Sequence, residues 1–154
     1  MKIATAAYPV SWCSTWEIYA QKQRDWVMKA SSNGADLVVF PEYGAMELAA
    51  LAGETAAGEI QGSIDAVSER QREMNKLFAD LAEEFAIHIL APSAPVREAT
   101  RTVNRVGLFT PTGVAGFQDK QIMTRFERDD WNVSGGGPLK LFETAIGKVG
   151  VLIC

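Results

Sequence analysis

The chain has 154 residues, of which 47% are hydrophobic and 22% are charged, so it can form a compact core and is neither disordered nor collagen-like. The net charge is −4 and the pI is about 5.0, which disfavours nucleic acid or an anionic membrane surface as a partner. No run approaches the roughly 20 apolar residues of a membrane span, and the N-terminus lacks the apolar core of a signal peptide. We therefore expect a cytoplasmic protein that does not bind membranes.

The first half of the sequence alternates between strand and helix patterns. Residues 2–7 predict a buried first strand, and a helix opens at Ser14, whose hydroxyl can cap the first turn. Residues 35–40 (ADLVVF) form a continuous apolar run, which is typical of a strand covered on both faces. After a stretch rich in glycine and alanine, helical spacing of apolar residues predicts a second helix over residues 66–85. A third strand is predicted over residues 87–91.

The second half predicts antiparallel strands. Residues 102–109 and 114–120 predict one hairpin, joined by a turn that contains proline and glycine. Residues 121–138 predict an irregular, charged loop. Residues 139–144 and 148–154 predict a second hairpin whose last strand is buried. A βαβ beginning followed by hairpins favours the α/β class with a mixed sheet.

The sequence contains no internal repeat, low-complexity segment or linker, so we expect one α/β domain over residues 1–154. Its last residue, Cys154, ends an apolar run that predicts a core strand. Because chain termini normally lie in exposed segments, we expect this domain to be the N-terminal part of a longer one.

Three reactive side chains each stand at the end of a predicted strand. Glu42 follows the strand over residues 35–40, Lys120 ends the strand over residues 114–120, and Cys154 ends the last strand. Functional groups gather where the strands of an α/β sheet give way to loops. If these strands are neighbours, we expect the three side chains to share a water-poor pocket at one edge of the sheet.

This set of side chains suits nucleophilic catalysis. A cysteine thiol with an ordinary pKa of about 8.5 is mostly protonated at neutral pH and needs a base or a cation beside it. His88 is the only histidine, and its place in an apolar strand favours a core residue over that base. If burial favours the protonated form of Glu42, this residue can take the thiol proton and later return it to a leaving amine. Lys120 can stabilise the negative charge that develops on the substrate and favour the thiolate of Cys154.

Three motifs in this order resemble the nitrilase superfamily. Residues 40–43 (FPEY) resemble its glutamate motif, residues 119–120 (DK) its lysine motif, and residues 149–154 (VGVLIC) the strand that delivers its nucleophile. Glu127, seven residues after Lys120, resembles the second glutamate of that family, which is structural or catalytic.

The resemblance implies an α-β-β-α sandwich with a mixed sheet and helices on one face, whose remaining part lies outside this chain. It implies hydrolysis of non-peptide carbon–nitrogen bonds by a Glu-Lys-Cys triad through a thioester, and no metal or organic cofactor. It also implies a homodimer or higher homo-oligomer.

Several functions stay open at the level of sequence. An amidase acting on a small-molecule amide is our leading hypothesis, with a nitrilase that uses the same triad as its nearest rival. Acyl transfer from the thioester to an amine is a third possibility, and a non-catalytic α/β binding module or inactive homologue is the rival from outside enzymology. Each residue alone has a plainer explanation, as a loop glutamate, a surface lysine or a small buried cysteine. Cys13, which lies among tryptophans, is interpreted as a structural thiol.

Overall fold

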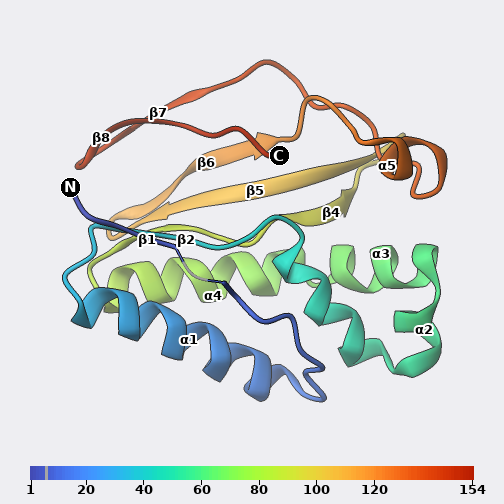
Figure 1. Cartoon of the computed structure of the whole chain (residues 1–154), viewed down its shortest axis with the longest axis horizontal. Coiled ribbons are helices and arrows are strands. Elements are labelled where there is room, and N and C mark those ends of the chain that lie inside the picture. Colours follow the sequence, from blue (N-terminus) through green and yellow to red (C-terminus); the bar gives the residue numbers. More distant parts are fainter. Residues whose placement is uncertain (6) are drawn as a thin grey trace.

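The structure is a computed structural model that describes residues 1–5 and 7–154, and it is a mixed α/β fold (Figure 1). The elements in chain order are β1 (Ile3–Thr5), α1 (Trp16–Ser32), β2 (Leu37–Val39), the 3₁₀ helix η1 (Gly44–Ala52), α2 (Glu54–Gly58), α3 (Ile60–Glu69), α4 (Gln71–Glu84), β3 (His88–Leu90), β4 (Ala94–Arg97), β5 (Thr102–Thr110), β6 (Gly113–Asp119), α5 (Arg125–Asp129), β7 (Leu141–Thr144) and β8 (Gly147–Gly150). The predicted α/β class is confirmed.

The main sheet is mixed, and its topology brings two loop regions to one edge. Its order is β1-β2-β3-β5-β4, with β6 on the free side of β5. Strands β1, β2 and β3 are parallel, whereas β5 is antiparallel to β3 and to β6. Strand β6 therefore runs in the same direction as β2, and the carboxyl ends of both strands lie at the same edge of the sheet.

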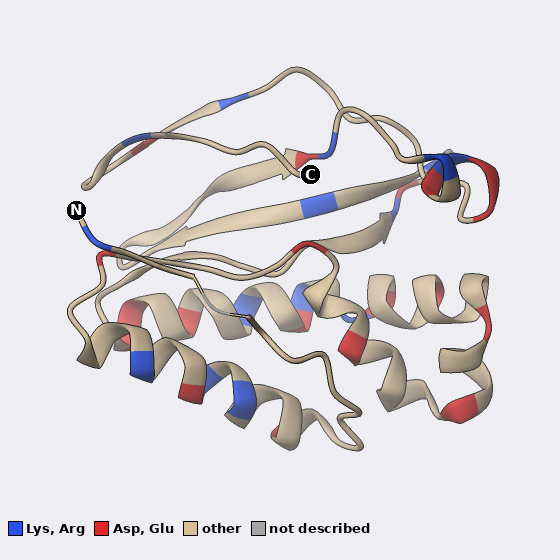
Figure 2. Cartoon of the chain, viewed as in Figure 1, with Lys and Arg blue, Asp and Glu red and all other residues tan. Residues whose placement is uncertain are grey.

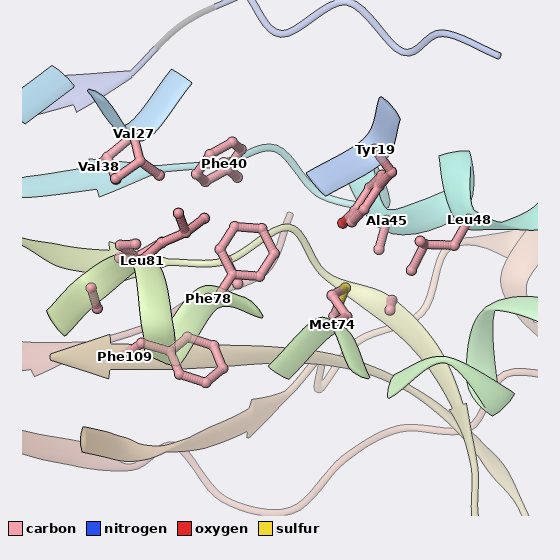
Figure 3. Close-up of a cluster of buried hydrophobic side chains, with 14 of the residues drawn as sticks. Tyr19, Val27, Val38, Phe40, Ala45, Leu48, Met74, Phe78, Leu81 and Phe109 are labelled. Atoms are coloured by element: carbon pink, nitrogen blue, oxygen red, sulfur yellow. The ribbon is translucent and has the colours of Figure 1, made fainter. Parts of the chain in front are cut away.

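Helices α1 and α4 cover one face of this sheet and bury its main core (Figures 1 and 3). The rings of Phe40, Phe78 and Phe109 follow one another across this core, with centroids 5.4 Å and 6.2 Å apart. Each fully buried aromatic or aliphatic side chain stabilises the fold by about 1.5–3 kcal/mol. This layer gives the strand ends a rigid base.

The opposite face of the sheet carries a smaller apolar cluster and the β7–β8 hairpin. The hairpin is a separate two-stranded sheet. The Phe142 ring of β7 lies directly over Gly116 of β6, where an added Cβ would be 2.5 Å from the ring. The absence of a side chain at residue 116 thus lets the hairpin pack closely on the sheet, just before the chain reaches Cys154.

The helices differ from the sequence-based expectation in two places. Thr15, not Ser14, caps α1, and its Oγ1 accepts a hydrogen bond of 3.3 Å from the backbone N–H of Ile18. The helix predicted over residues 66–85 is two helices, α3 and α4, which meet at Arg70. The two helices pack on different elements: α3 packs on η1 and β4, whereas α4 packs mainly on β5.

The first and last predicted strands are shorter and more exposed than expected. Strand β1 lies at one side of the sheet as an edge strand, and its side chains are largely exposed. The expected range also includes residue 6, which lies outside the described residues. Strand β8 ends at Gly150 because its partner β7 begins opposite that residue, at Leu141. Residues 151–154 are consequently not a strand, and Leu152 is 75% exposed. The predicted strand over residues 148–154 is therefore found only as far as residue 150, and the prediction that it is buried was wrong, because β8 itself is largely exposed.

Four further elements were not predicted. The helices η1 and α2 lie in the stretch rich in glycine and alanine, for which we expected no helix. The strand β4 pairs with the first half of β5, alongside residues 102–105. The loop expected over residues 121–138 contains the short helix α5. Figure 2 shows charges of both signs along α1 and α4 and only acidic residues on α2 and α3, while the strands carry few charges. Within residues 1–5 and 7–154, no helix combines the length and the apolar character needed to cross a bilayer.

Candidate active site

Glu42 lies in a tight turn that links β2 to η1. The turn is fixed by the backbone N–H of Tyr43, which donates to Ser93 Oγ at 2.9 Å, and by Gly44, whose N–H donates to the Pro41 carbonyl at 3.2 Å. Tyr43 adopts a left-handed conformation with φ of 55°. The Glu42 side chain remains 29% exposed, so it is open to solvent more than the sequence led us to expect.

Lys120 is the first residue after β6, and its side chain is only 1% exposed. Its Nζ lies 2.8 Å from Glu42 Oε1 and 2.7 Å from Glu127 Oε2. Burial alone would lower the pKa of Lys120, but hydrogen bonds to the two carboxylates and their charges outweigh burial and raise it. Lys120 is therefore a fixed ammonium between two carboxylates.

Glu127, on α5, is the buried counter-ion of this ammonium, with a side chain that is 4% exposed. Its Oε2 also accepts from the backbone N–H and the hydroxyl of Thr124, both at 2.8 Å, in a capping box that starts the helix. Its Oε1 accepts from the Tyr43 hydroxyl at 2.6 Å. Burial would raise the pKa of Glu127, but these donors together hold it at about 2. Glu127 is thus a permanent anion near neutral pH.

Two residues that the sequence analysis did not select complete this cluster. Asn104, fully buried on β5, donates through Nδ2 to Glu42 Oε1 at 3.0 Å. Burial and the bond to Glu127 raise the pKa of Tyr43, which keeps its hydroxyl protonated as a donor. The Tyr43 ring also packs edge to face on Trp131, with centroids 5.1 Å apart. The position of Tyr43 directly after Glu42 was the one available sequence signal.

Cys154 lies at the same edge of the sheet, beside the end of β6 (Figure 1). It lines a cavity of about 140 Å³ together with Glu42 and Ser93, and a second cavity of about 80 Å³ together with Asp119. Cys154 itself is exposed and has a φ of 70°. The structure thus brings the cysteine and the glutamate to one cavity. Lys120 and Glu127 are buried and do not line it, so the pocket that we expected all three triad side chains to share is lined by Glu42 and Cys154, with Lys120 bonded to Glu42.

The two remaining candidates lie apart from this cluster. His88 is buried in β3, where its Nδ1 lies 3.2 Å from the Asp36 carbonyl oxygen, in agreement with its interpretation as a core residue. Cys13 is buried. Burial raises the pKa of its thiol, and the nearby negative charge of Glu47 raises this pKa further. Among the described residues, no group of three or more His, Cys, Asp or Glu side chains is placed to hold a metal ion.

The fold and the sequence identify the class of protein. A sequence model of the family described as carbon-nitrogen hydrolase matches residues 2–154, and the chain belongs to this family. Membership agrees with the resemblance to the nitrilase superfamily that its three motifs indicated.

Individual relatives match the chain over part of their length. The probable hydrolase YhcX of Bacillus subtilis (strain 168) is 27% identical over all of this chain, which spans 29% of that protein. A carbon-nitrogen hydrolase from Helicobacter pylori G27 superposes with a TM-score of 0.73 at 17% identity, over 94% of this chain and 48% of that one. An amidase mutant from Nesterenkonia sp. AN1 gives 0.70 at 17% identity, over 100% of this chain and 57% of that one. The chain therefore spans between 29% and 57% of the length of these relatives, and the α-β-β-α sandwich type of fold is confirmed for the part it covers.

Proposed function

We propose that the chain carries the catalytic triad of a hydrolase that cleaves non-peptide carbon–nitrogen bonds, with a small-molecule amide as substrate. In this proposal Cys154 is the nucleophile, Glu42 the general base and acid, and Lys120 the cation that stabilises the oxyanion. One observation supports this proposal most directly. The Lys120 ammonium lies 2.8 Å from the Glu42 carboxylate, and Glu42 lines the same cavity as Cys154. Together they supply a nucleophile, a base and a stabiliser of the oxyanion, the three roles that thiol-based amide hydrolysis uses.

The reaction proceeds in two halves. First, Glu42 takes the thiol proton of Cys154, and the sulfur forms a bond to the amide carbon while Lys120 stabilises the oxyanion. The carbon–nitrogen bond then breaks, the leaving amine takes the proton back from Glu42, and a thioester remains. In the second half Glu42 takes a proton from water, the hydroxide forms a carbon–oxygen bond, and the carbon–sulfur bond breaks. The acid leaves, and the proton returns to the thiolate.

Glu127 has a different role in this proposal from Glu42. Because its pKa is held at about 2, it is a poor proton carrier near neutral pH. Its two oxygens are fully engaged by Lys120, Tyr43 and Thr124. We therefore assign Glu127 as the anion that holds the Lys120 ammonium in place, next to the reacting groups.

An amide substrate is favoured over a nitrile by the relatives. Among the structures that share this fold is the Nesterenkonia amidase mutant, which shows the result of Michael addition of acrylamide at its active-site cysteine. That protein is an amidase with a cysteine in its active site, the same pairing that we propose here.

We also propose that the protein is a homo-oligomer and that it is cytoplasmic. Light scattering of the purified protein tests the oligomeric state.

The test uses the full-length protein with a panel of aliphatic amides and the corresponding nitriles, scored by ammonia release. Cys154→Ser and Glu42→Gln should each lower kcat/KM on amides by at least about 1000-fold. Cys13→Ser is the matched control, since that buried thiol lies outside the cluster, and it should retain activity. Iodoacetamide should label Cys154 much faster than Cys13. A folded Glu42→Gln protein with wild-type turnover refutes the triad, and ammonia release from nitriles alone refutes the amidase assignment.

A further inference from the structure

Asn104 connects the two residues to which we assign the base and the oxyanion cation. Its side chain is fully buried on β5, and its Nδ2 donates to Glu42 Oε1 at 3.0 Å. Its backbone carbonyl accepts from the N–H of Lys120 at 2.9 Å. One residue in the middle of the sheet therefore fixes the carboxylate of one group and the backbone of the other.

The two oxygens of Glu42 are in different environments. Oε1 accepts from both Lys120 Nζ and Asn104 Nδ2. Among the described residues, no donor within hydrogen-bonding distance of Oε2 is found. An oxygen that already accepts two donors, one of them charged, binds an additional proton less readily than its free neighbour. The free oxygen belongs to the side chain that lines the cavity shared with Cys154.

The chemistry of the amide explains why asparagine suits this position. An amide donates without titrating or adding charge, so it holds the carboxylate at any pH, whereas an aspartate would repel it. The Asn104 Oδ1 is buried and has no partner among the described residues, which destabilises the fold. The Asn104 side chain therefore acts through its N–H, which donates to Glu42, and not through its oxygen.

We infer that Asn104 is a positioning residue: together with Lys120 it occupies Oε1 of Glu42 with hydrogen bonds. Oε2 is then the atom that exchanges protons with Cys154 and the leaving amine. This inference rests on the proposed function. Strand β5 makes the geometry rigid, because it is paired on both sides, by β3 and β4 on one and by β6 on the other.

The experiment compares Asn104→Leu with Gln23→Leu in the full-length protein. Gln23 is the matched control because it is also a fully buried amide with an unpartnered oxygen, and it donates to Tyr8 at 2.6 Å on the other side of the core. Asn104→Leu should lower kcat by about 10- to 100-fold with KM within about threefold, as expected for loss of one hydrogen bond to a charged group. Alkylation of Cys154 by iodoacetamide should slow by a similar factor. Gln23→Leu should leave both rates within about twofold of wild type.

Asn104→Asp separates positioning from packing, because it preserves the shape and replaces the donor with an acceptor. Its kcat should fall at least as far as that of Asn104→Leu. If the leucine variant does not fold, the aspartate variant tests the positioning role on its own. Retention of at least half of the wild-type kcat by a folded variant of either kind overturns the inference. Glu42→Gln in the same assay tells the two failures apart. If that variant is inactive while the Asn104 variants are active, only the positioning role fails; if it is active, the proposed function fails as well.

Discussion

Two buried ionic clusters within the part of the chain that the structure describes have nearly the same composition. In each, a glutamate that is 3% exposed accepts hydrogen bonds from a tyrosine hydroxyl, a lysine ammonium and a backbone N–H. The first, which we call the α1 cluster, consists of Tyr8, Ser11, Lys22 and Glu47. The second, the β6 cluster, consists of Tyr43, Lys120, Thr124 and Glu127, with Glu42 and Asn104 beside it.

The difference lies in what the lysine does with its remaining donors. Lys22 donates its two further hydrogen bonds to the Pro9 carbonyl and the Ser11 hydroxyl. All three donors of this ammonium therefore join the segment before α1 to Glu47 of η1. Lys120 donates a second hydrogen bond to another carboxylate, Glu42, which is partly exposed and lines a cavity. Burial and ion pairing are thus common to a structural cluster and a candidate active site. The second carboxylate and the cavity distinguish them.

Removing each lysine should give the largest contrast between the clusters. Lys120→Met and Lys22→Met each leave buried carboxylates without a cation, which should destabilise the fold by about 3–5 kcal/mol. Lys120→Met should in addition lower kcat by about 1000-fold, because the oxyanion loses its cation. Urea unfolding and turnover of the folded fraction measure the two effects. Equal activity of both variants would mean that the β6 cluster is as purely structural as the α1 cluster.

Neutralising each glutamate should sharpen the contrast. Glu127→Gln removes the anion that holds Lys120, and we expect kcat to fall by about 10- to 100-fold. Glu47→Gln should lower the unfolding free energy by about 1–3 kcal/mol and leave kcat within about twofold of wild type. Steady-state kinetics on both proteins, at a temperature where each is folded, make the comparison. A loss of kcat in Glu47→Gln as large as in Glu127→Gln contradicts it.

The stability of the protein should depend on Glu127 at acid pH. The pKa of Glu127 falls from an ordinary value of 4.5 to about 2 in the folded state. The stabilisation is therefore complete above about pH 4.5 and is lost as the pH falls towards 2, with a total of about 3 kcal/mol. Urea unfolding between pH 5 and pH 2 should show a shallower decline for Glu127→Gln than for wild type. Parallel declines of the two proteins would exclude this linkage.

The smallest expected effect comes from the two tyrosine hydroxyls. Tyr43→Phe and Tyr8→Phe each remove one hydrogen bond to a buried carboxylate and should cost about 1–3 kcal/mol of unfolding free energy. Only Tyr43→Phe should also lower kcat, by less than about tenfold, since Lys120 still holds Glu127. Thermal unfolding and kinetics of the pair provide the measurement. An unchanged kcat in Tyr43→Phe would limit this hydroxyl to a structural role.

The sequence was sufficient for the parts of the site that depend on single strands. Glu42 and Lys120 each follow an apolar run, and the rule that functional groups gather at strand ends predicts that they meet. Asn104 escaped this reasoning because it lies within a strand. Its contact with Glu42 depends on how β5 lies between β3 and β6, which no local pattern specifies.

The fold shows the same division between local and long-range information. The apolar spacing continues from α3 into α4, so the break at Arg70 is invisible in the pattern and is decided by the different surfaces on which the two helices pack. Ser14 and Thr15 are both good caps, and only the geometry of the first turn chooses between them. The run that ends at Cys154 is apolar enough for a strand, but a strand needs a partner, and β7 pairs only as far as Gly150.

The position of the Cys154 sulfur depends on the absence of a side chain at Gly116, where the Phe142 ring packs. Any side chain at residue 116 would push against the ring and lift the hairpin that leads to Cys154. Relatives that keep an aromatic ring at residue 142 should then keep glycine at 116, and relatives that lose one should lose both. A residue that never meets the substrate would in this way be inherited together with the nucleophile.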